Sequence, residues 1–298
     1  MQRDLIGLRV VAVHAHPDDE ALWTGGALAG VAMRGADVTV VTCTLGEQGE
    51  VIGDPFAQLV ADQADQLGGF RVAELARSLH ELGVRGEFLG GAGRWRDSGM
   101  IGDPANDDPR AFIHSGEEAE AQLAEVFSRI KPHLVITYGP DGGYGHPDHI
   151  RAHEITHAAA TQCDVAPQRI MWAVTSAEAL AAGLADIACI PHAWRRPEDG
   201  ELATVDQHDV ELMLSDAAVA AKLRGMKSHP TQLWIADGNT SVVNPQAASA
   251  GLKSTEHAIA VFALSNLIAQ PLLKTEHYQL GSGTAITDSA SLTAGLTW

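Results

Sequence analysis

Residues 8–20 read LRVVAVHAHPDDE, and this stretch decides the fold. Its apolar first half is typical of a buried strand, and its second half places histidines and carboxylates directly behind that strand. A related arrangement recurs where the apolar run LVITY at residues 134–138 is followed, after a short loop, by YGHPDH at residues 144–149. The tripeptide His-Pro-Asp therefore occurs twice, each time beyond a predicted strand. We expect one metal site that is assembled from two loops.

Apolar runs and helical periodicities alternate along the first half of the chain. The runs predict strands at Leu8–Val13, Val38–Thr42, Leu134–Tyr138 and Ile170–Thr175, with a weaker candidate at Glu87–Leu89. Helical periodicities cover Glu20–Arg34, Leu67–Leu82, Glu117–Ile130 and the segment after the second His-Pro-Asp. Strands that are apolar throughout and separated by helices predict an α/β fold with a doubly wound, mostly parallel, Rossmann-like sheet. Such sheets bind ligands beyond the carboxyl ends of their strands, where both His-Pro-Asp loops are expected.

The strand and helix pattern weakens after about residue 176, which indicates two regions. We expect a metal-binding catalytic domain over residues 1–175 and a smaller C-terminal region over residues 176–298 that packs on it and completes the substrate cleft. Helical character returns at Val210–Met226, whereas residues 281–298 are rich in Gly, Ser, Thr and Ala and form a candidate mobile tail. Long loops are predicted at Gly46–Pro55 and Gly90–Asp108.

Charge and cysteine content exclude several classes of function. Lys and Arg total 20 against 38 Asp and Glu, and this formal net charge of −18 argues against nucleic acid or a membrane surface as partner. The chain has no apolar run of about 18 residues, and its start lacks the apolar core of a signal peptide. Cys43, Cys163 and Cys189 are far apart and form no CxxC pair, which fits the reducing cytoplasm. The oligomeric state stays open.

The spacing within each His-Pro-Asp loop predicts which side chains could share a metal ion. Proline is preferred at the first position of a helix, so His16 and His146 are expected at helix N-caps. Asp19 and His149 follow three residues later on the same helix face. Since His16, Asp19 and His149 can converge, two imidazoles and one carboxylate would leave coordination positions open, as in catalytic zinc sites. The same ligands suit non-haem Fe(II), and the sequence does not separate the two metals.

The other polar residues of these loops can take more than one role. Asp18 lies between two candidate ligands and is expected to act as general base, with a helix-start carboxylate as the alternative. His146 could be a fourth ligand, an acid or a plain cap, and Asp148 could hydrogen-bond a ligand or catalytic histidine. Tyr144 could direct its hydroxyl toward a substrate oxygen or be an ordinary loop residue. Packed or outer positions are expected for three further histidines, His14, His153 and His157.

These residues resemble those of the LmbE/PIG-L family of zinc-dependent N-deacetylases. The resemblance rests on HPDDE at residues 16–20 paired with HPDH at residues 146–149, and it is dense over residues 8–153. It continues in islands at Lys222–Gln232 and Glu276–Leu280. Similarity to the mycothiol-pathway branch of the family lies in CTLGEQGEVIGD at 43–54, ADQLGGFR at 64–71 and GGAGRWRDSGM at 90–100. Members of that branch remove acetate from an N-acetylglucosaminyl-inositol.

The resemblance implies a role for each matching position. It implies zinc ligation by His16, Asp19 and His149. It implies catalysis by Asp18 as general base, by His146 as the residue that stabilises or protonates the transition state, and by Tyr144 as a mobile group that polarises the carbonyl. Contacts with the sugar–inositol hydroxyls are implied for Arg71, Asp97 and Glu50. The alternatives are a surface role for Arg71 and loop-structuring roles for the two acids.

The implied reaction is hydrolysis of the acetamide of 1D-myo-inositol 2-acetamido-2-deoxy-α-D-glucopyranoside to acetate and the free amino sugar. The nearest alternative is the sister amidase that cleaves mycothiol S-conjugates. Its pattern carries a Lys shortly after the first motif, where this chain has ALWTG at residues 21–25. A nucleotide-dependent oxidoreductase would need GxGxxG after the first strand. A metal- or sugar-binding module without activity would have no use for Asp18.

Overall fold

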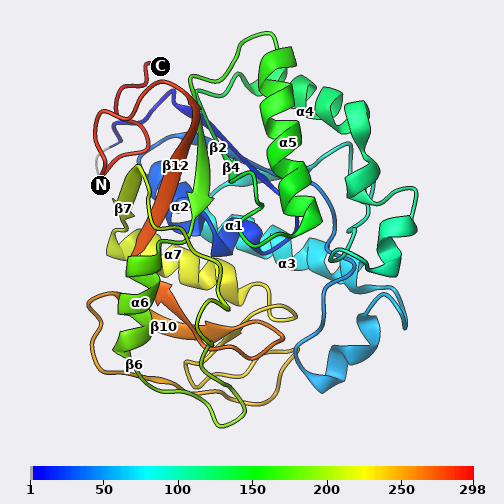
Figure 1. The fold of residues 1–298 in the computed structure, drawn as a ribbon, viewed down its shortest axis with the longest axis vertical. Coiled ribbons are helices and arrows are strands. Elements are labelled where there is room, and N and C mark those ends of the chain that lie inside the picture. The colour runs from blue at the N-terminus through cyan, green and yellow to red at the C-terminus, as the bar shows by residue number, and fades with distance from the viewer. Residues whose placement is uncertain (1–2) are drawn as a thin grey trace.

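A seven-stranded sheet forms the centre of the molecule (Figure 1), and the computed structural model describes residues 3–298. In spatial order its strands are β3 (Arg85–Phe88), β2 (Asp37–Thr42), β1 (Arg9–His14), β4 (Leu134–Tyr138), β5 (Arg169–Val174), β12 (Thr275–Gly283) and β7 (Val210–Met213). The first five of these are parallel, whereas β12 runs antiparallel to β5 and to β7. The mostly parallel α/β sheet expected from the sequence is confirmed.

The sheet grows in both directions from β1. In the register, Val10 pairs with Val38 of β2 on one side and with Leu134 of β4 on the other. The order of the strands therefore reverses at β1, and the crevice beyond the carboxyl ends of β1 and β4 is where such sheets bind ligands. The two His-Pro-Asp loops follow these two neighbouring strands. The fold thereby brings Asp148 next to His16, 132 residues earlier in the chain.

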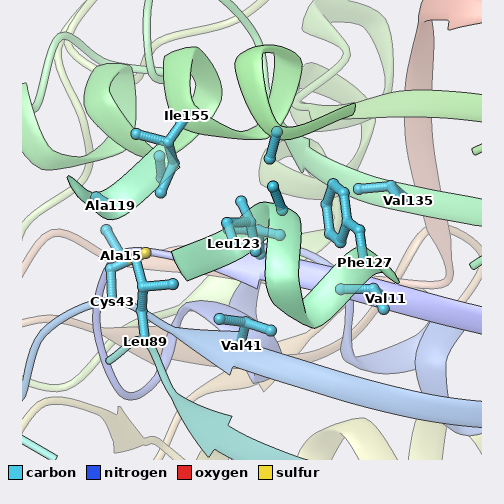
Figure 2. Packing of buried hydrophobic residues seen from close by; sticks show 14 of the residues in the cluster. Val11, Ala15, Val41, Cys43, Leu89, Ala119, Leu123, Phe127, Val135 and Ile155 are labelled. Carbon is cyan, nitrogen blue, oxygen red and sulfur yellow. The ribbon is translucent and has the colours of Figure 1, made fainter. Parts of the chain in front are cut away.

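Helices cover both faces of the sheet. The α-helices of residues 3–298 are α1 (Asp19–Leu22), α2 (Gly25–Met33), α3 (Leu67–Leu82), α4 (Gly116–Ile130), α5 (Pro147–Gln162), α6 (Ala177–Asp186), which contacts β11 of a smaller sheet, and α7 (Asp216–Lys227), and the 3-10 helices are η1 (Asp54–Leu59), η2 (Pro104–Asp107) and η3 (Phe112–His114). On one face, α4 and α5 bury Leu123, Phe127 and Ile155 against the sheet (Figure 2). On the other face, α2 packs on the sheet and contacts both α3 and α7.

The helix that leads from the first His-Pro-Asp loop differs from its prediction. The continuous helix expected over Glu20–Arg34 is divided into α1 and α2 by a break at Trp23 and Thr24. The Thr24 hydroxyl lies 2.9 Å from Nε2 of His14, at the end of β1. This contact ties the break between α1 and α2 to the end of β1.

The helical character expected over Val210–Met226 is corrected in its first part. Val210–Met213 forms the edge strand β7, in which Val210 pairs with Tyr278 of β12. Helix α7 starts only at Asp216, after Ser215 has capped it by accepting from the Ala218 N–H. Pairing with a strand some 60 residues later overrides the local pattern, because a short apolar segment does not distinguish strand from helix.

The chain beyond residue 175 both extends the main sheet and forms two small sheets of its own. These lie below α7 in Figure 1 and have the orders β11-β10-β8 and β6-β9. Their strands are β6 (Ile187–Cys189), β8 (Trp234–Ile235), β9 (Gly251–Leu252), β10 (Ala258–Ala263) and β11 (Gln270–Leu273). The division into two regions at residue 175 stays a prediction. Strands β12 and β7 lie after residue 175 but belong to the central sheet.

The last residues of the chain pack against β5. The buried guanidinium of Arg169 donates to the backbone carbonyls of Thr284, Ala285, Leu292 and Ala294. The predicted mobility of this tail stays a prediction, and these four contacts argue against it. Within residues 3–298, no helix is long and apolar enough to cross a membrane.

Candidate metal centre

Three buried side chains from the two His-Pro-Asp loops point at one spot. Nδ1 of His16 lies 3.4 Å from Oδ2 of Asp19 and 3.3 Å from Nε2 of His149, and the last two atoms are 3.5 Å apart. A tetrahedral zinc ion holds nitrogen ligands at about 2.0–2.1 Å, which places neighbouring ligand atoms roughly 3.3–3.4 Å from one another. The size and donor set of this triangle, which we call the metal triangle, therefore fit a tetrahedral metal ion without rearrangement.

The first loop reaches the metal triangle through a strained turn. β1 ends at His14, and α1 begins at Asp19, so the N-cap is Asp18 and not His16 as expected from the proline. Asp18 has a φ of 114°, a conformation that favours glycine and costs a residue with a side chain on the order of 1–3 kcal/mol. The Asp19 carboxylate accepts from the His16 backbone N–H at 2.9 Å. This turn places both side chains on the same side of the loop.

The second loop enters its helix in the expected way. His146 is the N-cap of α5, with Pro147 at the first helical position, and its Nδ1 accepts from the Asp148 N–H at 3.1 Å. Nδ1 of His149 lies 3.0 Å from the Gly142 carbonyl, to which it donates when it carries the proton. That tautomer leaves the lone pair of Nε2 free for the metal triangle. Burial, reinforced by His16 and opposed by Asp19, lowers the pKa of His149 to about 4.

Tyr138 joins the two loops, although its place in the sequence predicted no role for it. Its ring stacks on the His149 imidazole with centroids 4.1 Å apart, and its hydroxyl accepts from the Ala15 N–H at 2.9 Å. The signal available in the sequence was an aromatic residue at the carboxyl end of the apolar run LVITY, and the structure shows that Tyr138 is fully buried. Tyr138 therefore fixes the ring plane of one candidate ligand and the backbone beside the other.

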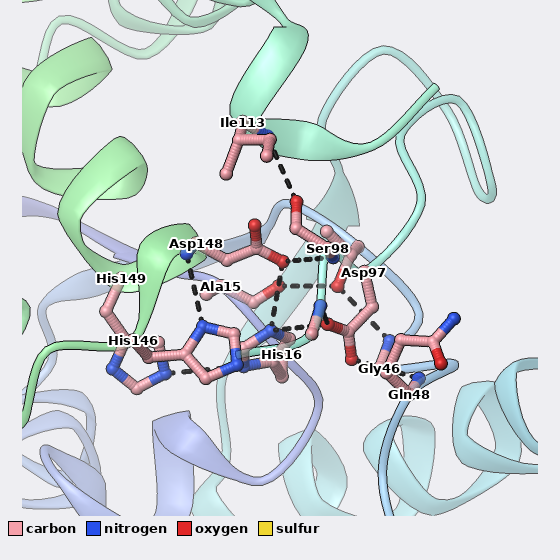
Figure 3. A network of polar contacts seen from close by, with 12 residues as sticks. Ala15, His16, Gly46, Gln48, Asp97, Ser98, Ile113, His146, Asp148 and His149 are labelled. Carbon is pink, nitrogen blue, oxygen red and sulfur yellow. Dashed lines mark hydrogen bonds and ion pairs between the residues drawn. The ribbon is translucent and has the colours of Figure 1, made fainter. Parts of the chain in front are cut away.

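The far side of the His16 ring faces two carboxylates (Figure 3). Its Nε2 lies 3.3 Å from Oδ2 of Asp148 and 3.6 Å from Oδ1 of Asp97. Burial alone would lower the pKa of His16, but Asp97, Asp148 and Asp19 together hold it well above its usual value. Asp148 also accepts from the Ser98 N–H at 2.9 Å, which ties the Gly90–Asp108 loop to this network. The carboxylates orient His16 so that Nδ1 faces the metal triangle.

Asp18 stands beside the metal triangle without joining it. Its Oδ2 lies 3.2 Å from Nη2 of Arg71, and its backbone N–H donates to Oε2 of Glu20 at 2.9 Å. Burial raises the pKa of Asp18 to about 7, reinforced by Asp19 and opposed by the Arg71 guanidinium. A carboxyl group whose pKa lies near neutrality can both accept and return a proton, as general acid–base catalysis requires.

The three residues implied in substrate binding lie in different settings. Arg71 is buried and donates to the carbonyls of Gly46 and Pro17, so it is no surface residue. Asp97 is also buried, and its oxygens accept from the Gln48 and Gly99 N–H groups, which is a loop-structuring arrangement.

Glu50, in contrast, faces open space. It lines a groove of about 1060 Å³ together with Gln48, Arg96, Asp108 and Arg110. One lining residue connects the groove to the site, since the Gln48 N–H donates to Asp97, whose other oxygen lies 3.6 Å from Nε2 of His16. Carboxylate and guanidinium groups line this groove.

Tyr144 and His146 lie beside His149, and His146 is buried. Tyr144 is half exposed, and its ring centroid lies 5.0 Å from that of His149 and 6.0 Å from that of His146. Burial, reinforced by His16 and His149, lowers the pKa of His146 to about 4. The positive φ angles of Gly143 and Gly145, 82° and 86°, let the chain turn sharply on both sides of Tyr144.

A buried network behind Asp18 escaped the sequence analysis, although Glu20 was part of the quoted motif. Glu20 is fully buried and also contacts the Ser78 hydroxyl and Nε2 of His229, the latter at 2.8 Å. Nearby, Glu276 accepts from the first N–H groups of α2 and forms a 2.6 Å ion pair with Lys222. The islands at 222–232 and 276–280 therefore act as supports for the first loop.

The three further histidines lie outside the metal triangle. His14 contacts Thr24 behind the loop. His153 contacts the Tyr138 carbonyl at 2.9 Å, and His157 accepts from Trp172 Nε1 at 2.9 Å. These contacts are those of packed and outer positions.

The family model described as PIG-L: GlcNAc-PI de-N-acetylase matches residues 11–160. This chain belongs to the PIG-L family. A 1D-myo-inositol 2-acetamido-2-deoxy-α-D-glucopyranoside deacetylase of Corynebacterium efficiens is 62% identical and covers 100% of this chain and 96% of its own length. A protein of the same name from Corynebacterium diphtheriae is 63% identical over 96% of this chain and 97% of its own.

Solved structures support the PIG-L fold at low identity. N,N'-diacetylchitobiose deacetylase from Pyrococcus horikoshii has a TM-score of 0.51 at 17% identity, covering 75% of this chain and 70% of its own. The 4-carboxy-2-hydroxymuconate hydratase GalB from Pseudomonas putida has a TM-score of 0.52 at 17% identity, covering 94% of this chain and 99% of its own. One architecture therefore carries different reactions, so the activity must be argued from the site.

Proposed function

We propose that this chain is a zinc-dependent N-deacetylase that hydrolyses the acetamide of 1D-myo-inositol 2-acetamido-2-deoxy-α-D-glucopyranoside, a step of mycothiol biosynthesis. One observation supports metal-dependent hydrolysis as the reaction class. The buried carboxyl group of Asp18 lies next to a metal triangle that leaves coordination positions open. Relatives of that name at 62–63% identity over nearly the whole chain support the choice of substrate.

His16, Asp19 and His149 would hold the ion. The chemistry supplied by zinc at such a site is the activation of water and the polarisation of an amide carbonyl. His2Asp ligation also suits Fe(II), so zinc is the proposed ion and Fe(II) the alternative for the assay below.

Asp18 moves the proton in the proposed reaction. Its carboxylate accepts a proton from the attacking water and returns it to the departing amine nitrogen, which yields acetate and the free amino sugar. Arg71 holds the Asp18 carboxylate in place, and Glu20 holds its backbone. Since Arg71 already donates to the loop carbonyls, we propose that it positions Asp18 as well as, or instead of, touching the substrate.

Tyr144 and His146 would act on the substrate carbonyl. Both lie on the open side of His149, where their side chains can donate a hydrogen bond to an oxyanion as it forms. The groove beyond Asp97 would receive the inositol end, with Glu50 on its wall.

The test is release of primary amine from the acetylated substrate by chelator-treated protein to which Zn²⁺ or Fe²⁺ is restored. We expect turnover only with metal, and a kcat/KM for this substrate well above that for a mycothiol S-conjugate. Faster cleavage of the S-conjugate would assign the chain to the sister amidase. Turnover that is unaffected by the chelator would contradict the role of the metal triangle.

A further inference from the structure

A second group of metal-ligating side chains lies at the edge of the main sheet. Nε2 of His208 lies 3.8 Å, and Nε2 of His277 lies 3.6 Å, from Oε2 of Glu211. The two imidazole rings approach edge to face, with centroids 4.6 Å apart. We call His208, Glu211 and His277 the distal cluster. Its three ligand atoms all lie within 4.8 Å of one another.

The distal cluster is separate from the metal triangle. Glu211 on β7 pairs directly with His277 on β12, and His208 lies just before β7. The metal triangle lies beyond β1 and β4, and β5 stands between these strands and β12 (Figure 1). None of the three residues takes part in the contacts that build the site described above.

One histidine of the cluster is buried, and its nitrogen in the cluster approaches Glu211 without forming a hydrogen bond within residues 3–298. The His277 side chain is only 2% exposed, and its buried Nε2 has no hydrogen-bond partner within residues 3–298. Buried polar atoms are nearly always satisfied, so an unpaired imidazole nitrogen that faces a second imidazole and a carboxylate indicates a missing ligand.

We propose that His208, Glu211 and His277 bind a second transition-metal ion of the Zn²⁺ class. Two imidazoles and a carboxylate are the donors that Zn²⁺ takes at sites with an open fourth position, and imidazoles disfavour Mg²⁺ and Ca²⁺. An ion pair between protonated His277 and Glu211 is a weaker explanation. Burial, reinforced by His208, lowers the pKa of His277 and favours the neutral imidazole that a metal ion needs.

This second site should bind more weakly than the first. Its nitrogen–oxygen distances of 3.6 and 3.8 Å exceed the 3.3–3.5 Å sides of the metal triangle. The Glu211 side chain is 54% exposed and has to close over the ion. Once bound, the ion would link the edge strand β7 to β12, and the resulting stabilisation would grow with ion concentration.

The test counts ions on tag-free, chelator-treated protein equilibrated with Zn²⁺ and analysed by plasma mass spectrometry. We expect two ions per chain for the wild type, one for His149→Ala, one for His277→Ala, and none for the double variant. One ion on the wild type and none on His149→Ala would overturn the proposal. Because the decisive count uses a variant that lacks the first site, it is independent of the proposed deacetylase activity.

Two further variants guard against misfolding of the buried His277 position. His208→Ala and Glu211→Gln change partly exposed residues of the same cluster, and each should remove the second ion. The matched control is His257→Ala, since His257 lies 3.3 Å from the Asp186 carboxylate but belongs to no group of three potential ligands within residues 3–298. Loss of an ion from this control would show surface binding and contradict the assignment.

Co²⁺ provides a readout of geometry. In the His149→Ala background, Co²⁺ bound by two imidazoles and a carboxylate should give the visible absorption of a four- or five-coordinate ion. Glu211→Gln should abolish this absorption, while His257→Ala should leave it unchanged. Zn²⁺ should also raise the Tm of His149→Ala, and fail to raise that of the His149→Ala/His208→Ala protein.

Discussion

In the loop after β1, His16 of the His-Pro-Asp tripeptide contributes its Nδ1 to the metal triangle. In the loop before α5, the corresponding residue, His146, is instead the N-cap of a helix. The aspartates differ as well. Asp18 points to Arg71 beside the triangle, whereas Asp148 turns back to hold the far side of the His16 ring. Only the position after the tripeptide, Asp19 in one loop and His149 in the other, contributes a ligand atom in both.

The backbone explains this difference. At the second loop, proline begins α5, so the side chains follow ordinary helix geometry from His146 onward. At the first loop, the positive φ of Asp18 delays the helix until Asp19 and turns His16 inward. Glu20 secures that strained turn by accepting from the Asp18 N–H. The same tripeptide thus supplies a candidate ligand and the proposed base in one loop, and a helix cap and a support for His16 in the other.

Separate replacement of the two histidines of the second loop is expected to give the largest effect. His149→Ala removes one corner of the metal triangle and is expected to abolish metal binding at this first site together with turnover. His146→Ala removes a residue that is not part of the metal triangle, so the protein should keep its ion at the first site while kcat falls by roughly 10²-fold or more. Metal content and amine release are measured on both proteins. Loss of the first-site ion from His146→Ala would make His146 a ligand and break the distinction.

The next largest loss of activity is expected from changes of the aspartate at the third position of each His-Pro-Asp tripeptide. Asp18→Asn preserves shape but removes the base, so kcat should fall by about 10²–10⁴-fold while the metal content stays at the wild-type value. Steady-state amine release with metal analysis measures both quantities. Full activity would show that Asp18 is only a strained helix start.

Asp148→Asn is the matched change in the second loop. Asp148 supports His16 and does not touch the reacting water, so metal affinity or activity should fall by only about 10–100-fold. Titration of the chelator-treated protein with Zn²⁺ measures the affinity. A loss as large as that of Asp18→Asn would mean that both loops contribute to catalysis in the same way.

The smallest effect concerns a proton on His16. Asp97, Asp148 and Asp19 outweigh burial and raise its pKa well above 6.5, so the metal-free protein carries this proton at neutral pH and must release it when the ion binds. Zn²⁺ affinity should therefore rise with pH by up to about tenfold per unit below that pKa. Calorimetry in buffers of different ionisation enthalpy counts the released proton. Affinity that does not change between about pH 6 and 8 would contradict the raised pKa.

Local patterns were enough for much of the fold and the position of the site. Helix α3 spans Leu67–Leu82 as its periodicity predicted, and the strands β1, β2, β4 and β5 lie within one residue of their apolar runs. Val210–Met213 could not be predicted in this way, because its strand character comes from pairing with β12. Glu20 likewise carried no signal of its role, since its partner His229 is 209 residues away.

The sequence by itself determined the sheet, its parallel core and the two loops that meet beyond it, because apolar runs and a repeated tripeptide are local features. Only the tertiary structure decided which histidine of each loop belongs to the metal triangle and which aspartate lies beside the triangle without joining it. It also decided that Tyr138 and Glu20 bind the backbone of the first loop. This arrangement of the side chains depends on the strained backbone of Asp18 and on contacts between distant segments, which no short sequence pattern encodes. The distal cluster depends on the same kind of information, because β7 and β12 bring its residues together.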